Sequence, residues 1–202
     1  MDFQEQEIKF YIQDLAKLSE RLRVCGAEMV RERVLERNLR LDTADYSLQK
    51  GGRLLRLRKD DRARITYKEN AQIEDGVMSR TEIEFIADDF EVARKLFEAL
   101  GYQVKVVYEK YRRVFRLGDV DVMLDELPFG DFIEIEAPNK TLIEGVAQML
   151  GLNWSCGIGT NYLGLMQNAR VNADLKFNDL TFENFKGVEI SAKDLNVKAA
   201  DV

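Results

Sequence analysis

Charged and apolar residues alternate along several segments of this chain, and the charges within one segment tend to share a sign. The first example is EQEIK at residues 5–9, where Glu5, Glu7 and Lys9 occupy alternate positions around Ile8. Residues two apart in a β-strand point to the same face. The pattern therefore predicts a strand with one charged face and one apolar face.

The same alternation recurs in later segments and assigns residues to two faces of a sheet. The charged face collects Glu5, Glu7, Lys9, Arg56, Arg58, Arg64, Lys68, Arg80, Glu82, Glu84, Lys110, Arg112, Asp121, Asp125, Glu134 and Glu136. The apolar face collects Ile8, Phe10, Leu55, Leu57, Ile65, Tyr67, Ile83, Phe85, Val122, Leu124, Ile133 and Ile135. The apolar face requires a cover, which the predicted helices supply.

The repetition of like charges on single strands indicates ligands of opposite sign. An ordinary solvated face mixes signs, because neighbouring like charges are mildly unfavourable. Carboxylate clusters suit a hard cation such as Mg²⁺ or Mn²⁺, and arginine and lysine clusters suit phosphates.

The charged face cannot form a dry core. Burying each such charge costs about 20 kcal/mol in the idealised limit, and several kcal/mol after relaxation. An open sheet with its polar side in water is one solution. If the strands close on themselves, the charged face instead lines a water-filled tunnel.

Periodicity and turn residues predict an α+β chain. Leucines at helical spacing predict a helix over 14–24 that ends at Gly26, and two more helices are expected over 88–100 and 141–150. The expected strands after the first cover 29–41, 53–59, 64–68, 79–86, 104–117, 120–124 and 132–137.

Composition excludes several classes of function. The net charge is −6, which argues against a general nucleic-acid surface. The chain has no histidine and only Cys25 and Cys156, so histidine-based catalysis is excluded and a zinc site is not expected. No apolar run approaches about 18 residues, and the charged N-terminus predicts no signal peptide, so we expect a cytoplasmic protein without a membrane span.

An ordered set of motifs resembles the CYTH superfamily, the triphosphate tunnel metalloenzymes, which includes class IV adenylyl cyclases and thiamine triphosphatases. EQEIK matches the ExExK signature of that family. The other matching segments are LLRLR at 54–58, TYK at 66–68, RTEIE at 80–84, EKYR at 109–112, LDELPFGDFIEIEA at 124–137 and NYLGL at 161–165. The resemblance implies a closed eight-stranded antiparallel β-barrel with helices packed outside, formed by residues 1–168. Residues 169–202 are then expected to be an extension that packs on the barrel, with a frayed end.

The resemblance also implies roles for individual residues. The main metal ligands would be Glu5, Glu7, Glu134 and Glu136, assisted by Asp125 and by Glu82 or Glu84. Six basic residues would grip the triphosphate, with Arg80 nearby: Lys9, Arg56, Arg58, Lys68, Lys110 and Arg112. Glu5, Glu7 or a deprotonated Lys9 would take the proton of the attacking group. Asn38 and Asp42 match family positions without a defined role, and Tyr162 is expected in a helix beside one mouth of the tunnel.

The leading functional hypothesis is a metal-dependent triphosphatase that uses Mg²⁺ or Mn²⁺. Its substrate would be inorganic tripolyphosphate, thiamine triphosphate or a nucleoside triphosphate. The alternatives are a class IV adenylyl cyclase, which forms cyclic AMP and pyrophosphate, and a non-catalytic polyphosphate or nucleotide-binding module. The expected partner is thus a small triphosphate or nucleotide, bound by a monomer or a homodimer.

Overall fold

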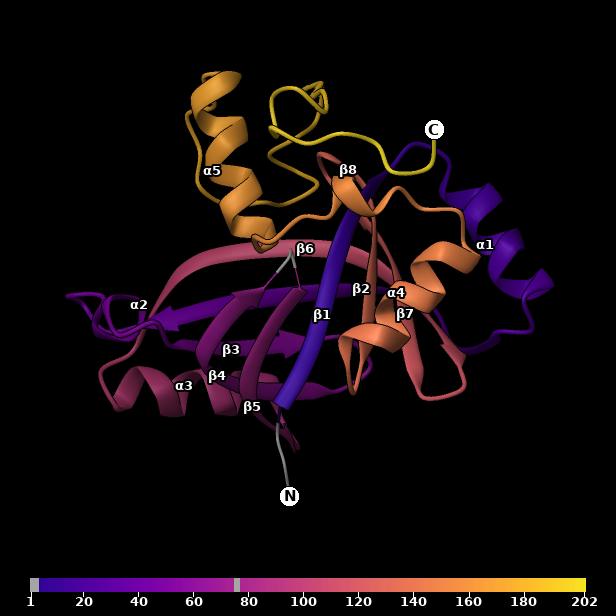
Figure 1. Ribbon diagram of the computed structural model, residues 1–202. Coiled ribbons are helices and arrows are strands. Elements are labelled where there is room, and N and C mark those ends of the chain that lie inside the picture. The colour runs from indigo at the N-terminus through magenta and orange to yellow at the C-terminus, as the bar shows by residue number, and fades with distance from the viewer. Residues whose placement is uncertain (1–3, 75–76) are drawn as a thin grey trace.

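The chain folds into a closed barrel of eight antiparallel strands, in the order β1-β5-β4-β3-β2-β6-β7-β8 (Figure 1). The computed structural model describes residues 4–74 and 77–202, without the side chains of residues 4 and 5. The strands are β1 (Gln4–Ile12), β2 (Glu28–Asp42), β3 (Leu54–Lys59), β4 (Ala63–Glu74), β5 (Val77–Ala87), β6 (Gln103–Leu117), β7 (Val120–Leu127) and β8 (Gly130–Ala137). The closed eight-stranded fold predicted from the motifs is confirmed.

Three helices form where the leucine spacing and the capping residues predict them: α1 (Leu15–Val24), α3 (Phe90–Ala99) and α4 (Lys140–Met149). The short helix α2 (Ser47–Lys50) was not predicted, and α5 (Tyr162–Asn172) contains the Tyr162 that we expected in a helix. A short 3₁₀ turn covers Trp154–Cys156. The side chains of Asp14, Asp89 and Asn139 accept hydrogen bonds from backbone N–H groups in the first turns of α1, α3 and α4. Such caps stabilise the first turn by satisfying N–H groups that lack a helical partner.

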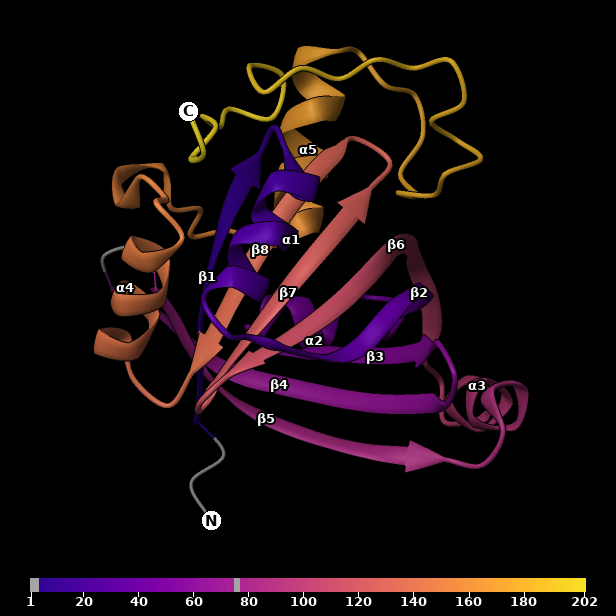
Figure 2. The ribbon, with the colours of Figure 1, turned by 90° about the vertical axis from the view of Figure 1, so that its right-hand side faces the viewer.

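The outer face of the barrel carries the main apolar core. Ile8, Phe10 and Ile12 of β1 are fully buried against α1 and α4, together with apolar residues of β7 and β8. A separate cluster joins β2, β3 and β4 to α2 and α3. Figure 2 shows α1 and α4 beside β1, β7 and β8, with α3 on the opposite side of the barrel.

The cover over the apolar face is incomplete. Ile83 and Phe85 of β5 are each about half exposed. Val92 and Leu96 of α3 are also exposed, so that helix shields β3 more than β5. The prediction that helices cover the whole apolar face was wrong for this strand.

The segment after α5 runs back along the barrel (Figures 1 and 2). Leu180 exchanges backbone hydrogen bonds with Val107 and Glu109 of β6, and Ala200 donates one to Tyr11 of β1. Leu180 and Ala200 are fully buried. The end that we expected to be frayed therefore packs on the barrel, because it supplies apolar side chains and backbone partners.

Within the described ranges, every helix is too short or too polar to cross a lipid bilayer.

Candidate functional site

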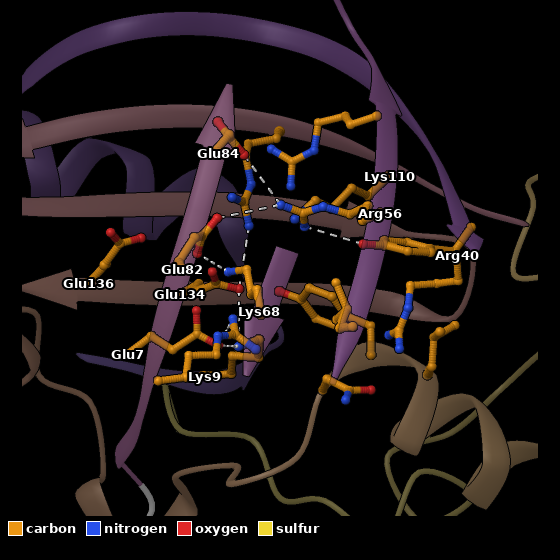
Figure 3. Close-up of a pocket in the computed structure, with 18 residues that line it drawn as sticks. Glu7, Lys9, Arg40, Arg56, Lys68, Glu82, Glu84, Lys110, Glu134 and Glu136 are labelled. Atoms are coloured by element: carbon orange, nitrogen blue, oxygen red, sulfur yellow. Dashed lines mark hydrogen bonds and ion pairs between the residues drawn. The ribbon is translucent and has the colours of Figure 1, made fainter. Parts of the chain in front are cut away.

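The inside of the barrel holds a polar cavity of about 450 Å³ (Figure 3). Seven strands and the start of α5 contribute to its wall. The lining residues are Glu7, Lys9, Arg40, Leu54, Arg56, Arg58, Lys68, Arg80, Glu82, Glu84, Tyr108, Lys110, Arg112, Glu134, Glu136, Asn161, Tyr162 and Leu163. Most of the charged face predicted from the alternation thus lines an internal cavity, but Arg64, Asp121 and Asp125 do not belong to this lining.

Three carboxylates meet where β1 pairs with β8. Glu7 lies opposite Glu136 in the register, and Lys9 lies opposite Glu134. One carboxylate oxygen from each of Glu7, Glu134 and Glu136 lies within 4.8 Å of the others. An all-oxygen set of this kind fits a hard divalent cation such as Mg²⁺ or Mn²⁺.

Two cations already touch this acidic cluster. Lys9 Nζ lies 2.5 Å from Glu7 Oε1 and 3.3 Å from Glu134 Oε2. Arg80 Nη2 lies 3.0 Å from the same Glu7 oxygen. Burial alone would lower the pKa of Lys9, but Glu134 and Glu7 outweigh that effect and raise it. Lys9 therefore remains an ammonium at neutral pH.

Asp125 binds the basic residues of β6. Its carboxylate accepts hydrogen bonds from Arg112 at 2.6 Å through two nitrogens, from Lys110 Nζ at 2.9 Å and from the Tyr162 hydroxyl at 2.7 Å. Asp125 is fully buried. A carboxylate with this many donors orients Lys110 and Arg112 toward the cavity.

Glu36 has the matching role on β2, on the other side of β6 from Asp125. It is fully buried, 3.3 Å from Arg58 Nη1 and 3.7 Å from Lys110 Nζ. Asn38 Oδ1 accepts a hydrogen bond of 3.0 Å from Arg58 Nε. Burial alone would raise the pKa of Glu36, but Arg58 and Lys110 outweigh it and lower the pKa.

A third acid–base group lies on β3, β4 and β5. Lys68 forms an ion pair with Glu82, its partner in the β4–β5 register. Arg56 Nη2 lies 3.7 Å from Glu84 and donates a hydrogen bond of 3.0 Å to Thr66. Arg56 Nε is nevertheless buried without a hydrogen-bond partner among the described residues. Such an unsatisfied donor beside a cavity is suited to an anionic ligand.

Tyr108 brings a phenol into the basic part of the cavity. Its hydroxyl accepts a hydrogen bond of 3.4 Å from Arg56 Nη1. Burial alone would raise its pKa, but the nearby Arg56, Arg58 and Lys110 lower it to about 8.

The structure brings most of the predicted site residues together but divides the acids into two kinds. Glu7, Glu134 and Glu136 form one cluster, whereas Glu82, Glu84 and Asp125 lie outside that cluster and are each paired with cations. The predicted ligand Glu5 lies opposite Arg80 in the β1–β5 register, and its side chain is outside the described part. All seven basic residues predicted near the triphosphate line the cavity, whereas Arg64, which we also placed on the charged face, pairs with Asp60 at 3.3 Å.

The structure also places four residues that we either did not predict or left without a role. We did not predict Glu36, Arg40 or Tyr108. Each lies two residues from a predicted residue on the same strand and therefore points to the same side. Asp42 lies outside this cavity and accepts hydrogen bonds from backbone N–H groups, including those of Leu48 and Gln49.

One family model and one related sequence match this chain over most of its length. The sequence model of the CYTH domain matches residues 4–146. A Methanocaldococcus jannaschii protein named as a candidate adenylate cyclase is 28% identical over 134 residues, which are 65% of this chain and 75% of that protein.

Solved structures share the fold. A conserved hypothetical protein from Pyrococcus furiosus is 28% identical and superposes with a TM-score of 0.67, over 78% of this chain and 97% of the other. A candidate adenylyl cyclase from Hippeastrum, described as having a dominant triphosphatase activity, superposes with a TM-score of 0.62 at 18% identity, over 81% of this chain and 95% of the other.

Proposed function

Because this chain belongs to the CYTH domain family, we propose that it is a metal-dependent triphosphatase that binds its substrate inside the barrel. The observation that carries the proposal is the acidic cluster of Glu7, Glu134 and Glu136, which shares one cavity with eight basic residues. An anion-binding module gains nothing from three clustered carboxylates unless it also holds a cation. We assign these three as the metal ligands.

The basic residues would neutralise and orient the triphosphate. Arg58, Lys110 and Arg112 are held by buried acids, so they enter the reaction already positioned. Arg56 and Lys68 would bind from β3 and β4, and Arg80 and Lys9 would act next to the acidic cluster. Phosphoryl transfer depends mainly on such positioning and charge neutralisation.

A Mg²⁺ or Mn²⁺ ion held by the acidic cluster would supply further neutralisation of the phosphate oxygens and would acidify nearby water. In the hydrolytic step, a water oxygen forms a bond to the terminal phosphorus as the bridging P–O bond breaks. The shortened phosphate chain leaves with the electrons of that bond. The proton released by water passes to a carboxylate, for which Glu7 is placed in the cluster.

Lys9 is better suited to binding than to proton transfer. A general base must be deprotonated before the reaction, and the raised pKa of Lys9 opposes this. We therefore assign Lys9 to the phosphate and no longer propose it as a base.

An adenylyl cyclase is the second candidate, favoured by the name of the M. jannaschii relative. In that reaction the ribose 3′-hydroxyl attacks the α-phosphorus, and pyrophosphate leaves. The same basic and acidic residues serve both reactions, which differ in the phosphorus atom beside the acidic cluster.

Product identification separates the candidates. The purified protein is incubated with Mg²⁺ or Mn²⁺ and, separately, with tripolyphosphate, thiamine triphosphate and ATP, and the products are identified by ³¹P NMR and chromatography. Orthophosphate together with the shortened chain is expected. Cyclic AMP with pyrophosphate would overturn the hydrolase proposal, and an absence of turnover with either metal would favour a binding module.

A further inference from the structure

A second cavity of about 260 Å³ adjoins the first. The two cavities share Arg40 and Leu163 in their walls. The second is also lined by Asp42, Tyr46, Lys105 and Arg170, together with apolar and amide side chains. Figure 3 shows Arg40 on the side of the first cavity that lies away from Glu7 and Glu136. The second cavity therefore continues the binding space away from the acidic cluster.

Arg40 differs from the other arginines of the barrel interior. No described residue forms an ion pair with it or accepts its hydrogen bonds, and its Nε is buried. Burial lowers its pKa, and the neighbouring Arg56 and Arg80 lower it further, although Tyr108 and Asp42 oppose them. A largely buried guanidinium without an acceptor is costly, and an anion would relieve that cost.

The remaining wall of the second cavity is also cationic. Arg170 Nε is buried without a hydrogen-bond partner among the described residues. Asp42, the only carboxylate in this lining, accepts backbone N–H bonds from Thr43, Leu48 and Gln49. The backbone at the start of α2 therefore engages its carboxylate. The three positive charges of Arg40, Lys105 and Arg170 outnumber this single negative charge.

The one aromatic ring of this lining favours an anion over a nucleobase. Tyr46 has the ammonium of Lys105 over its ring, 4.4 Å from the centroid. A base that stacked on this face would have to displace that cation. Basic side chains, rather than an open aromatic face, are the binding groups of this cavity.

We propose that Arg40 and Arg170 bind a fourth phosphate of a chain whose first three phosphates occupy the barrel, so that the substrate class extends to phosphate chains longer than three. This inference rests on the proposed function. Inorganic tetrapolyphosphate and a nucleoside 5′-tetraphosphate both carry the required group. Arg40 bridges the two cavities, and Arg170 acts only in the second.

Calorimetry without metal tests this directly, because it measures binding apart from turnover. Dissociation constants are measured for tripolyphosphate, tetrapolyphosphate, ATP and adenosine 5′-tetraphosphate. Charge-assisted hydrogen bonds to the fourth phosphate should make tetrapolyphosphate bind about tenfold more tightly than tripolyphosphate. The same preference for adenosine 5′-tetraphosphate over ATP would extend the ligand class to nucleotides, and a preference confined to tetrapolyphosphate would assign it to inorganic chains.

Two variants and a matched control locate the effect. Arg40→Gln and Arg170→Gln should each reduce the ratio of the tripolyphosphate to the tetrapolyphosphate dissociation constant toward one. Arg62→Gln removes an equal charge from the exposed turn between β3 and β4, and it should keep the ratio of the unmodified protein.

The binding results distinguish the fourth-phosphate site from the proposed function on which it rests. Tight tripolyphosphate binding with an equal affinity for tetrapolyphosphate would overturn the fourth-phosphate site alone. A preference for ATP over tripolyphosphate that depended on Arg40, without a preference for tetrapolyphosphate, would assign the cavity to a nucleoside instead. Failure to bind any of the four ligands would overturn the proposed function itself.

Discussion

Glu7 and Lys9 lie two residues apart on the inner face of β1 and form an ion pair of 2.5 Å inside the barrel. The pair is almost completely shielded from solvent. It sets the ammonium between the acidic cluster and the basic remainder of the cavity. The ExExK spacing therefore places a carboxylate and an ammonium side by side, where a metal ion and a phosphate would meet.

Lys9→Met is expected to weaken binding of tripolyphosphate by about tenfold or more, since it removes a charged donor beside two carboxylates. Calorimetry in the absence of metal measures this. Lys17→Met removes the same charge from the exposed face of α1 and should bind like the unmodified protein. Equal affinity of the two variants would contradict the assignment of Lys9 to the phosphate.

Glu36→Gln should lower the free energy of unfolding by about 3–5 kcal/mol, because Arg58 and Lys110 would lose their shared buried counter-charge. Urea denaturation at neutral pH measures the change. Glu20→Gln, on the exposed side of α1, is the control and should unfold within about 0.5 kcal/mol of the parent. If the two variants proved equally stable, Glu36 would not be the counter-ion that its distances indicate.

Tyr162→Phe deletes one hydrogen bond to the buried carboxylate of Asp125. We expect a loss of about 1–3 kcal/mol in the free energy of unfolding, because the bond involves a charged acceptor. Tyr102→Phe is a suitable control, since the Tyr102 hydroxyl has no hydrogen-bond partner among the described residues. A loss in Tyr162→Phe no larger than in the control would show that Asp125 is satisfied by its two basic partners alone.

Tyr108 should make phosphate binding sensitive to alkaline pH. Its pKa is lowered to about 8, so the neutral phenol becomes a phenolate as the pH rises through that value. The new negative charge lies among Arg56, Arg58 and Lys110 and would repel the phosphate. The affinity for tripolyphosphate is therefore expected to fall above about pH 8, and in Tyr108→Phe the fall should move to higher pH. Identical pH profiles for the two proteins would assign the titration to another group.

Much of this site could be predicted from strand alternation alone. Glu7 and Lys9, Arg56 and Arg58, and Lys110 and Arg112 each occur as charged pairs two residues apart, and the structure turns all of them inward. Closure of the barrel followed from the resemblance to a known family, since alternation is equally compatible with an open sheet.

The division of the acids could not be predicted in the same way. Whether a carboxylate meets a cation or another carboxylate depends on the register between strands. Glu136 lies opposite Glu7, whereas Asp125 lies opposite Arg112. That register is a property of the closed barrel and is not visible along one strand. Glu36 and Arg40 were missed because opposite charges alternate with Asn38 on β2, which resembles a solvated strand.

The central claim is that Glu7, Glu134 and Glu136 hold a divalent cation, and a direct measurement is the binding of Mn²⁺ to the protein without substrate, followed by electron paramagnetic resonance. The account predicts one Mn²⁺ per chain, with affinity at least about tenfold lower in Glu134→Gln and unchanged in Glu20→Gln. Equal Mn²⁺ affinity in all three proteins would contradict it.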